Sequence, residues 1–374
     1  MAEITPATRQ MLARLVVPTS GVGVDEPTPL PQNVWRAFRS AAIRERVVPA
    51  LASGVANGRL PATDDQAAEA ADLWLEMMRR CLRIEGRLLW LVDSLAGRGV
   101  EIRVLKGPAS AHLDHERPEL RQFGDLDVLV RGCDMPVLFE VLSDDGFDRR
   151  FPEPRPGFDQ RFTKSVCFAG EVEIDVHRTI AEGPVGNRIP VVDLWRDSVP
   201  FEVGNVEVRA LANDERFIHA CLHTVLAAPP ARLSSLSDVA RGLVGDLVDA
   251  DRVAEIGARW GVSAVVDRAV STAIAELWRP VAIDPNWTTT SPVSLMDSVM
   301  IESHRRRETS SAARAVLSLA TLPTLRDKIA YATALALPKA SYVESRHAGR
   351  ADRFCHAYRQ TVRAIQGSAA SRRG

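Results

Sequence analysis

The spacing of apolar residues changes twice along this chain, and the two changes constrain the fold more than any other feature. Residues 64–96 repeat apolar side chains at spacings of three, four and seven, which predicts a long amphipathic helix. After Gly97 and Gly99, apolar and charged residues alternate over 100–104 as in a β-strand. The helical period returns from Leu211 onward. The sequence therefore predicts an α/β (α+β) fold, in which a small mixed sheet lies between N-terminal and C-terminal helices.

Further elements are predicted from the same patterns. Asp64 or Asp65 is expected to cap the long helix, Asp134 to cap a later one, and Gly146 to end that one. Strands are predicted at 123–130, 161–168, 171–177, 198–203 and 206–210, and helices at 109–112, 135–143, 214–227, 236–247, 250–260 and 264–278. A linker rich in proline and threonine is expected at 279–292, with further helices beyond it. The predicted regions are a leader with helices (1–95), a core that contains the predicted sheet (96–210) and a helical domain (211–374).

Composition excludes several classes of protein. Apolar residues make up 46% of the 374 residues and charged residues 25%, as in globular proteins of one complex or two coupled domains. The 47 basic and 48 acidic side chains nearly cancel, so no overall electrostatic field attracts the protein to nucleic acid or to a membrane. The five cysteines form no CxxC pair, so they are interpreted as thiols in a reducing compartment. With no membrane span and no secretory leader in the sequence, we expect a cytoplasmic protein.

The strongest chemical signal is Gly124-Asp125-Leu126-Asp127, followed by three aliphatic residues. In a strand, residues two apart point to the same face, so Asp125 and Asp127 are predicted to project together. Two carboxylates roughly 4 Å apart repel by about 1 to 4 kcal/mol, and a divalent cation reverses that cost. Mg²⁺ or Mn²⁺, which take oxygen ligands and substrate phosphates, are the expected metals.

A third acid is predicted from the strand at 171–177. Strict alternation places Glu173, Asp175 and His177 on one face. If this strand lies beside the one carrying Asp127, Asp175 completes a metal site and can accept the proton of an incoming hydroxyl. Glu173 is either an alternative ligand or a solvated neighbour.

A phosphate-binding turn is predicted upstream of these acids. A strand ends at Lys106 and Gly107, and the helix after it would direct free N–H groups toward a phosphate. Gly107 would allow close approach, while Lys106 and Ser110 would supply a charge and a hydroxyl. Arg121, three residues before Gly124, would reach the same triphosphate. The structural alternatives are a solvated end of the strand for Lys106 and an ion pair with Glu119 or Asp125 for Arg121.

The series LKG (105–107), R-x-x-GDLDVLV (121–130) and EIDVH (173–177) resembles the uncharacterised bacterial nucleotidyltransferases of the polymerase-beta-like superfamily. The resemblance extends to FIHACLHTV (217–225), SSLSDVARGL (234–243) and LPKASYVESRHAG (337–349). It implies a turn at Gly107 for the triphosphate, a metal pair at Asp125 and Asp127, and a third acid at Asp175. Pro108 departs from the family pattern of Gly-Ser or Gly-Gly, and it removes one backbone donor.

The resemblance also implies transfer of a nucleoside monophosphate from an NTP, expected to be ATP, to an unidentified acceptor. The acceptor would be a small molecule, a peptide or an RNA, and pyrophosphate would be released. Two alternatives remain open at this point. The chain could be a catalytically silent, antitoxin-like module that binds nucleotides, or the same site could transfer a phosphoryl group.

Other residues that attract functional interpretations also have structural ones. Paired histidines four residues apart, His219 and His223, suggest zinc, but no third ligand is evident, so a place in the core or in the lining of the active site is favoured. The roles of both, and of His177 and Asp238, are left open. The run Arg305–Arg307 is read as a solvated helix face rather than a nucleic-acid contact.

Overall fold

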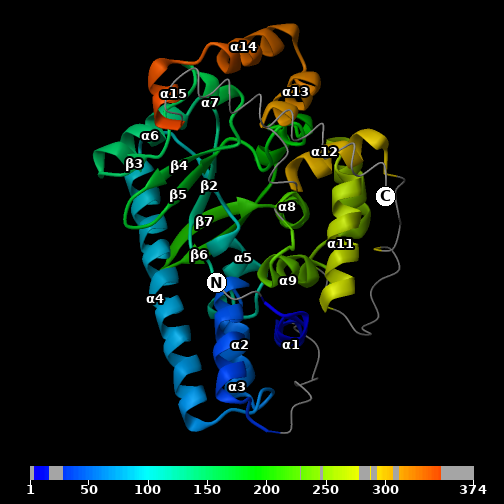
Figure 1. Cartoon of the computed structure of the whole chain (residues 1–374). Coiled ribbons are helices and arrows are strands. Elements are labelled where there is room, and N and C mark those ends of the chain that lie inside the picture. Colours follow the sequence, from blue (N-terminus) through cyan, green and yellow to red (C-terminus); the bar gives the residue numbers. More distant parts are fainter. Residues whose placement is uncertain are drawn as a thin grey trace.

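A computed structural model describes residues 4–16, 28–227, 229–244, 247–277, 287, 293–305 and 311–346. The predicted linker at 279–292, apart from Trp287, lies outside these residues, as do Arg306, Arg307 and the end of the chain beyond Arg346. Figure 1 shows a sheet flanked by helices that precede it and helices that follow it in the sequence.

The sheet has seven strands in the order β3-β4-β5-β2-β1-β7-β6. β2 pairs with β5 and β1 pairs with β7 in parallel, whereas the other neighbours are antiparallel, so the predicted mixed sheet is confirmed. The strands are β1 Ile102–Leu105, β2 Leu126–Val130, β3 Asp148–Arg149, β4 Ser165–Ala169, β5 Ile174–His177, β6 Ser198–Val203 and β7 Val206–Leu211.

Helices precede, interrupt and follow the sheet. Those before it are α1 Pro6–Val16, α2 Gln32–Arg44, α3 Val48–Ala56 and α4 Asp64–Leu95, and those between the strands are α5 Gly107–Leu113, α6 Met135–Asp144 and α7 Phe158–Arg161. After β7 come α8 Asn213–Leu226, α9 Leu233–Gly242, α10 Ala250–Trp260, α11 Ser263–Leu277, α12 Leu295–Arg305, α13 Ser311–Thr321, α14 Leu325–Ala336 and α15 Ala340–Arg346. Short 3₁₀ turns include η1, Pro118–Leu120. Within the described part of the chain, no helix combines the length and apolar character needed to span a bilayer.

The two faces of β2 belong to different parts of the core. Leu126, Val128 and Val130 are packed with α4 and α6 in one buried cluster. Leu129 belongs to the other cluster, which joins residues of α1–α3 to residues of α8–α11. Because side chains alternate along a strand, Asp127 shares the face of Leu129 and is directed toward the C-terminal helices.

Several predicted boundaries were wrong for local reasons. The cap of α4 is Thr63, not Asp64 or Asp65, because the Thr63 side chain accepts from the Gln66 backbone and the Gln66 side chain accepts in return. The predicted strand at 123–130 begins only at Leu126. The one predicted to begin at Arg161 begins at Ser165, because Arg161 ends α7. The helix predicted at 236–247 begins and ends earlier, as α9.

Candidate active site

The centre of the site is a pair of acids on neighbouring strands. β2 and β5 run in parallel with Asp127 directly opposite Asp175, so both carboxylates lie on the same face of the sheet. Oxygen atoms of these two acids and a ring nitrogen of His177 all lie within 4.8 Å of one another. The approach of Asp175 to Asp127 was predicted from alternation, whereas His177 was placed on the right face without a role.

Asp127 is bound from two sides. Lys106 Nζ donates to Asp127 Oδ1 over 2.8 Å, and His177 Nε2 lies 2.7 Å from the same oxygen. Burial disfavours the charged form of Asp127, but Lys106 and His177 outweigh it and hold the pKa of the carboxyl well below its usual range. Lys106 is therefore not a solvated end of its strand.

Asp175 has the opposite electrostatic environment. Burial and the negative charge of Asp127 both raise the pKa of its carboxyl. Cys167 on β4 faces Asp175 from the other side, and burial together with the Asp175 charge raises the pKa of the Cys167 thiol to about 12. The two acids thus differ: Asp127 is fixed as an anion, and Asp175 is the more basic carboxylate.

Asp125 stands apart from this pair. It lies in a bend before β2, and it belongs to neither of the two potential metal-ligand clusters found among the described residues. Its Oδ1 lies 3.7 Å from Nη1 of Arg46, a residue in the turn between α2 and α3. Because the observed strand begins only at Leu126, the side-by-side projection of Asp125 and Asp127 stays a prediction.

The turn between β1 and α5 has an unusual backbone. Lys106 has a φ of +46° and Gly107 a φ of +28°, values that residues with a side chain rarely adopt. Ser110 is buried within α5. Gly124 lies beneath Arg80, whose Nη2 donates to the Gly124 carbonyl over 2.8 Å. An added Cβ at Gly124 would lie 3.3 Å from that nitrogen, so the glycine allows the arginine to approach the backbone.

Arg121 makes a bidentate ion pair with Asp238 of α9. Its Nε and Nη2 atoms each donate to a different Asp238 oxygen over 2.7 Å, and both side chains are almost fully buried. The predicted alternative, an ion pair of Arg121 with Glu119 or Asp125, was wrong about the acid that pairs with it. With its fork engaged in this way, Arg121 connects the loop before β2 to α9.

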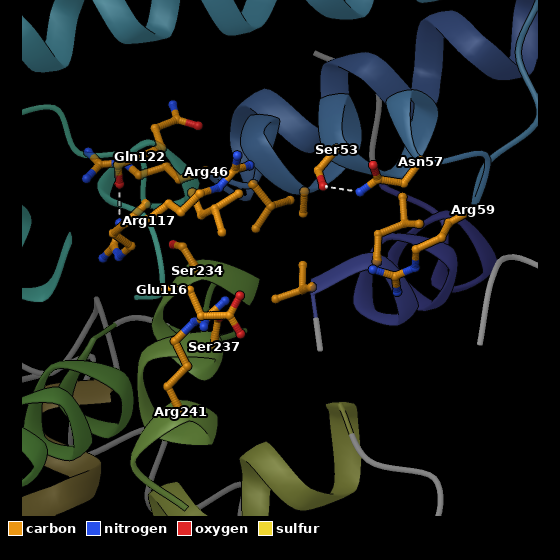
Figure 2. A pocket seen from close by; sticks show the side chains of 16 residues that line it. Arg46, Ser53, Asn57, Arg59, Glu116, Arg117, Gln122, Ser234, Ser237 and Arg241 are labelled. Atoms are coloured by element: carbon orange, nitrogen blue, oxygen red, sulfur yellow. Dashed lines mark hydrogen bonds between the residues drawn. The ribbon is translucent and has the colours of Figure 1, made fainter. Parts of the chain in front are cut away.

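Two pockets contain basic residues that interact with the acids. The first, here called the arginine pocket, has a volume of about 330 Å³ and lies between α1, α3, the η1 segment and α9 (Figure 2). Arg46 and Arg121 line it together with three more arginines, Arg59, Arg117 and Arg241. Arg46 connects this pocket to Asp125.

The second, here called the histidine pocket, has a volume of about 270 Å³. Its lining includes Lys164, His219 and His223, and also His304 and Arg314. No hydrogen bond or ion pair of the Lys164 ammonium occurs within the described residues, although the charges of Asp127 and Asp175 act on it. Burial and then the charges of Lys106 and Lys164 lower the pKa of His223 to about 3, so this ring is neutral. Neither His219 nor His223 joins a potential metal cluster in the part of the chain that is described.

The acid pair suits a hard divalent cation. Asp127 and Asp175 offer carboxylate oxygens, the ligands that Mg²⁺ and Mn²⁺ prefer, and their mutual repulsion would be relieved by such an ion. The ring of His177 is already bonded to Asp127, which suits an orienting role better than direct ligation. The fit therefore rests on two oxygen donors from adjacent strands.

Sequence reasoning missed Arg46, Arg80, Lys164 and Arg241. Arg46, Arg80 and Lys164 lie in none of the motifs named above, and each reaches the site only through the fold. Arg241 lies in SSLSDVARGL (234–243), to which the resemblance extends, and it is spaced with Ser234 and Ser237 as one face of a helix.

The chain matches the model of a protein family described as uncharacterised nucleotidyltransferase over residues 31–278, about two thirds of its length. The matched segment begins before α2 and ends just after α11, so it includes the sheet, both acids and most of the helices around the two pockets. No curated protein and no solved structure matches the chain.

Proposed function

The chain belongs to this family of uncharacterised nucleotidyltransferases, and from that premise we propose a metal-dependent enzyme of the polymerase-beta-like type. It moves a nucleoside monophosphate from an NTP, with ATP as the expected donor, to a hydroxyl or phosphate of an acceptor. The observation that carries the proposal is the register of β2 and β5, which sets Asp127 directly opposite Asp175.

In this proposal Asp127 and Asp175 would hold Mg²⁺ or Mn²⁺, and Asp125 would be a further ligand once its side chain leaves Arg46. The bound ion would neutralise charge on the phosphates of the donor. Lys106 and His177 keep Asp127 ionised and fix its orientation. This arrangement supports catalysis by positioning and charge stabilisation rather than by a covalent intermediate.

In the transfer step, an acceptor oxygen forms a bond to the α-phosphorus of the donor. The bond from that phosphorus to the bridging oxygen breaks, and its electron pair leaves with pyrophosphate. Asp175 takes the proton of an acceptor hydroxyl through a carboxylate oxygen. Lys106 and Lys164 attract the triphosphate, while Gly107, Ser110 and Gly124 remain its proposed contacts near the turn.

The test replaces Asp127 with Asn and compares pyrophosphate release, from each NTP with cell extract as the source of acceptor, with and without Mg²⁺. We expect a loss of at least about a hundredfold. Asp148→Asn, at an exposed acid on the edge strand β3, is the matched control and should keep full activity. Circular dichroism checks that both variants fold.

Full turnover by Asp127→Asn would refute the metal assignment. The mass of the product decides the type of transfer: an added nucleotide supports the proposal, whereas a single added phosphate would assign phosphoryl transfer instead. Binding of nucleotide without any turnover, on every acceptor fraction tried, would assign a silent binding module.

A further inference from the structure

The arginine pocket concentrates positive charge in a molecule whose formal net charge is −1. Five arginines line it, and Glu116 is the one carboxylate among the described residues of its lining. Figure 2 shows the arginines entering from several elements: Arg46 from the turn after α2, Arg117 from the segment before η1 and Arg241 from α9. Such convergence from distant parts of the sequence is characteristic of a binding site rather than of a solvated helix face.

Part of this charge takes part in no ion pair within the described residues, although the charges of Asp238, Glu116 and Asp114 act on Arg241 from farther away. Asp238 neutralises Arg121, and Asp125 lies near Arg46. Arg241, in contrast, makes no ion pair within the described residues, and its buried Nε has no hydrogen-bond partner there. Burial is the largest factor that lowers the pKa of Arg241, yet a guanidinium stays protonated at neutral pH, so the charge remains.

The arginines also repel one another. After burial, the largest effect on Arg46 is the charge of Asp125, which favours its charged form, whereas Arg121 in the pocket and Arg232 and Arg80 outside it disfavour that form. A partly buried positive cluster of this kind costs stability until an anion enters it. The free-energy balance of the pocket therefore favours binding of a negatively charged group.

The neutral part of the lining suits a phosphate. Ser234 and Ser237 lie on the same face of α9 as Arg241, and Gln122, Ser53 and Asn57 also line the pocket. Guanidinium forks bind phosphate oxygens through paired hydrogen bonds, and hydroxyl groups complete the shell. A volume of about 330 Å³ holds a phosphate with a small body, but not a folded domain.

We propose that the arginine pocket binds a phosphate group of the acceptor, so that the enzyme modifies a phosphate-bearing molecule. This inference rests on the proposed function. The triphosphate of the donor has to meet Asp127 and Asp175, beside which Lys106 and Lys164 already stand. Neither Asp127 nor Asp175 lines the arginine pocket, and Arg46 in its lining lies near Asp125, so we assign this pocket to the second substrate.

The test measures phosphate binding by the full chain, without metal or NTP, using isothermal titration calorimetry. The probes are inorganic phosphate, ribose 5-phosphate and an RNA trinucleotide with a 5′-phosphate. Arg241→Gln removes a charge that no ion pair uses among the described residues, and we expect its affinity for ribose 5-phosphate to fall at least about tenfold. Arg117→Gln, at an exposed rim position, is the second variant, for which we expect a smaller loss. Arg209→Gln, on the β6–β7 hairpin, is the matched control and should bind like the wild type.

Equal affinities of wild type, Arg241→Gln and Arg117→Gln would overturn the inference. Tighter binding of the trinucleotide than of ribose 5-phosphate would identify RNA ends as the source of the phosphate, and equal binding would identify a small molecule. Both outcomes support a phosphate site.

A competition experiment separates acceptor from donor. With Mg²⁺ and a non-hydrolysable ATP analogue at saturation, the affinity for ribose 5-phosphate should change less than about twofold, because the two ligands occupy different pockets. Displacement of the sugar phosphate by the analogue would overturn the acceptor assignment. Asp127→Asn should retain phosphate binding even as it loses transfer, so failure of this inference and failure of the proposed function give different results.

Discussion

Replacing Asp238 with Asn tests whether Arg121 is held as a structural element or kept available as a ligand. In the folded chain, two bonds of 2.7 Å join the Arg121 guanidinium to Asp238, and the side chains are only 11% and 12% exposed. The partners are far apart in sequence and connect the loop before β2 to α9. Asn can accept one of the two bonds but cannot neutralise the buried cation.

The expected cost follows from that geometry. Removing one partner of a buried ion pair, which leaves the other charge uncompensated, destabilises a protein by about 3–5 kcal/mol. Urea unfolding followed by circular dichroism measures the loss. Arg121→Gln and the double variant complete a thermodynamic cycle, in which the double variant should lose less than the sum of the two singles. A loss below about 1 kcal/mol in Asp238→Asn would refute the structural role of the pair.

The pH dependence has a definite direction. Burial alone would raise the pKa of Asp238, but Arg121 and His115 outweigh burial and lower it below its usual value. Because the folded pKa is depressed, the stabilisation is fully present above the unfolded pKa of about 3.9 and is lost as the pH falls through that value toward the folded pKa. The difference in unfolding free energy between wild type and Asp238→Asn should be constant from about pH 5 to 7 and shrink below about pH 4.

Three further variants test the scaffold by urea unfolding. Thr63→Ala removes the capping box of α4 and should cost about 1 kcal/mol, so an unchanged midpoint would contradict the capping role. Gly186→Ala would place a Cβ 1.9 Å from the Ala181 carbonyl oxygen, and we expect a loss of about 3 kcal/mol or more, because backbone has to move. Gly58→Ala meets no atom within 4 Å, but at a φ of +69° it should still cost about 1–2 kcal/mol. A loss of stability in Gly58→Ala as large as that in Gly186→Ala would contradict the steric explanation for Gly186.

Local pattern was enough to predict the acids that meet. Alternation in LDVLV and in VEIDVH places Asp127 and Asp175 on definite faces of their strands, because the side-chain period of a strand is two. The hairpin of β6 and β7 was equally predictable, since Gly204 and Asn205 interrupt two alternating runs. The pattern failed before β2, where a bend replaces the start of the predicted strand. Asp125 lies in this bend, so the alternation of side chains along a strand does not fix the direction of its carboxylate.

What the sequence could not predict are contacts between segments that no local rule relates. Arg46 reaches Asp125 across 79 positions, and Arg121 reaches Asp238 across 117. Each pairing competes with nearer acids. The packing of the α2–α3 turn against the loop before β2 decides the first, and the packing of α9 against the same loop decides the second. Lys164 belongs to no motif in the sequence, yet the pairing of β4 with β5 brings it near both acids. The charges that would bind substrates are therefore set by tertiary packing, whereas the proposed metal ligands are set by strand periodicity. This division explains why the reaction class was readable from three short motifs while the acceptor had to be inferred from the charge of a pocket.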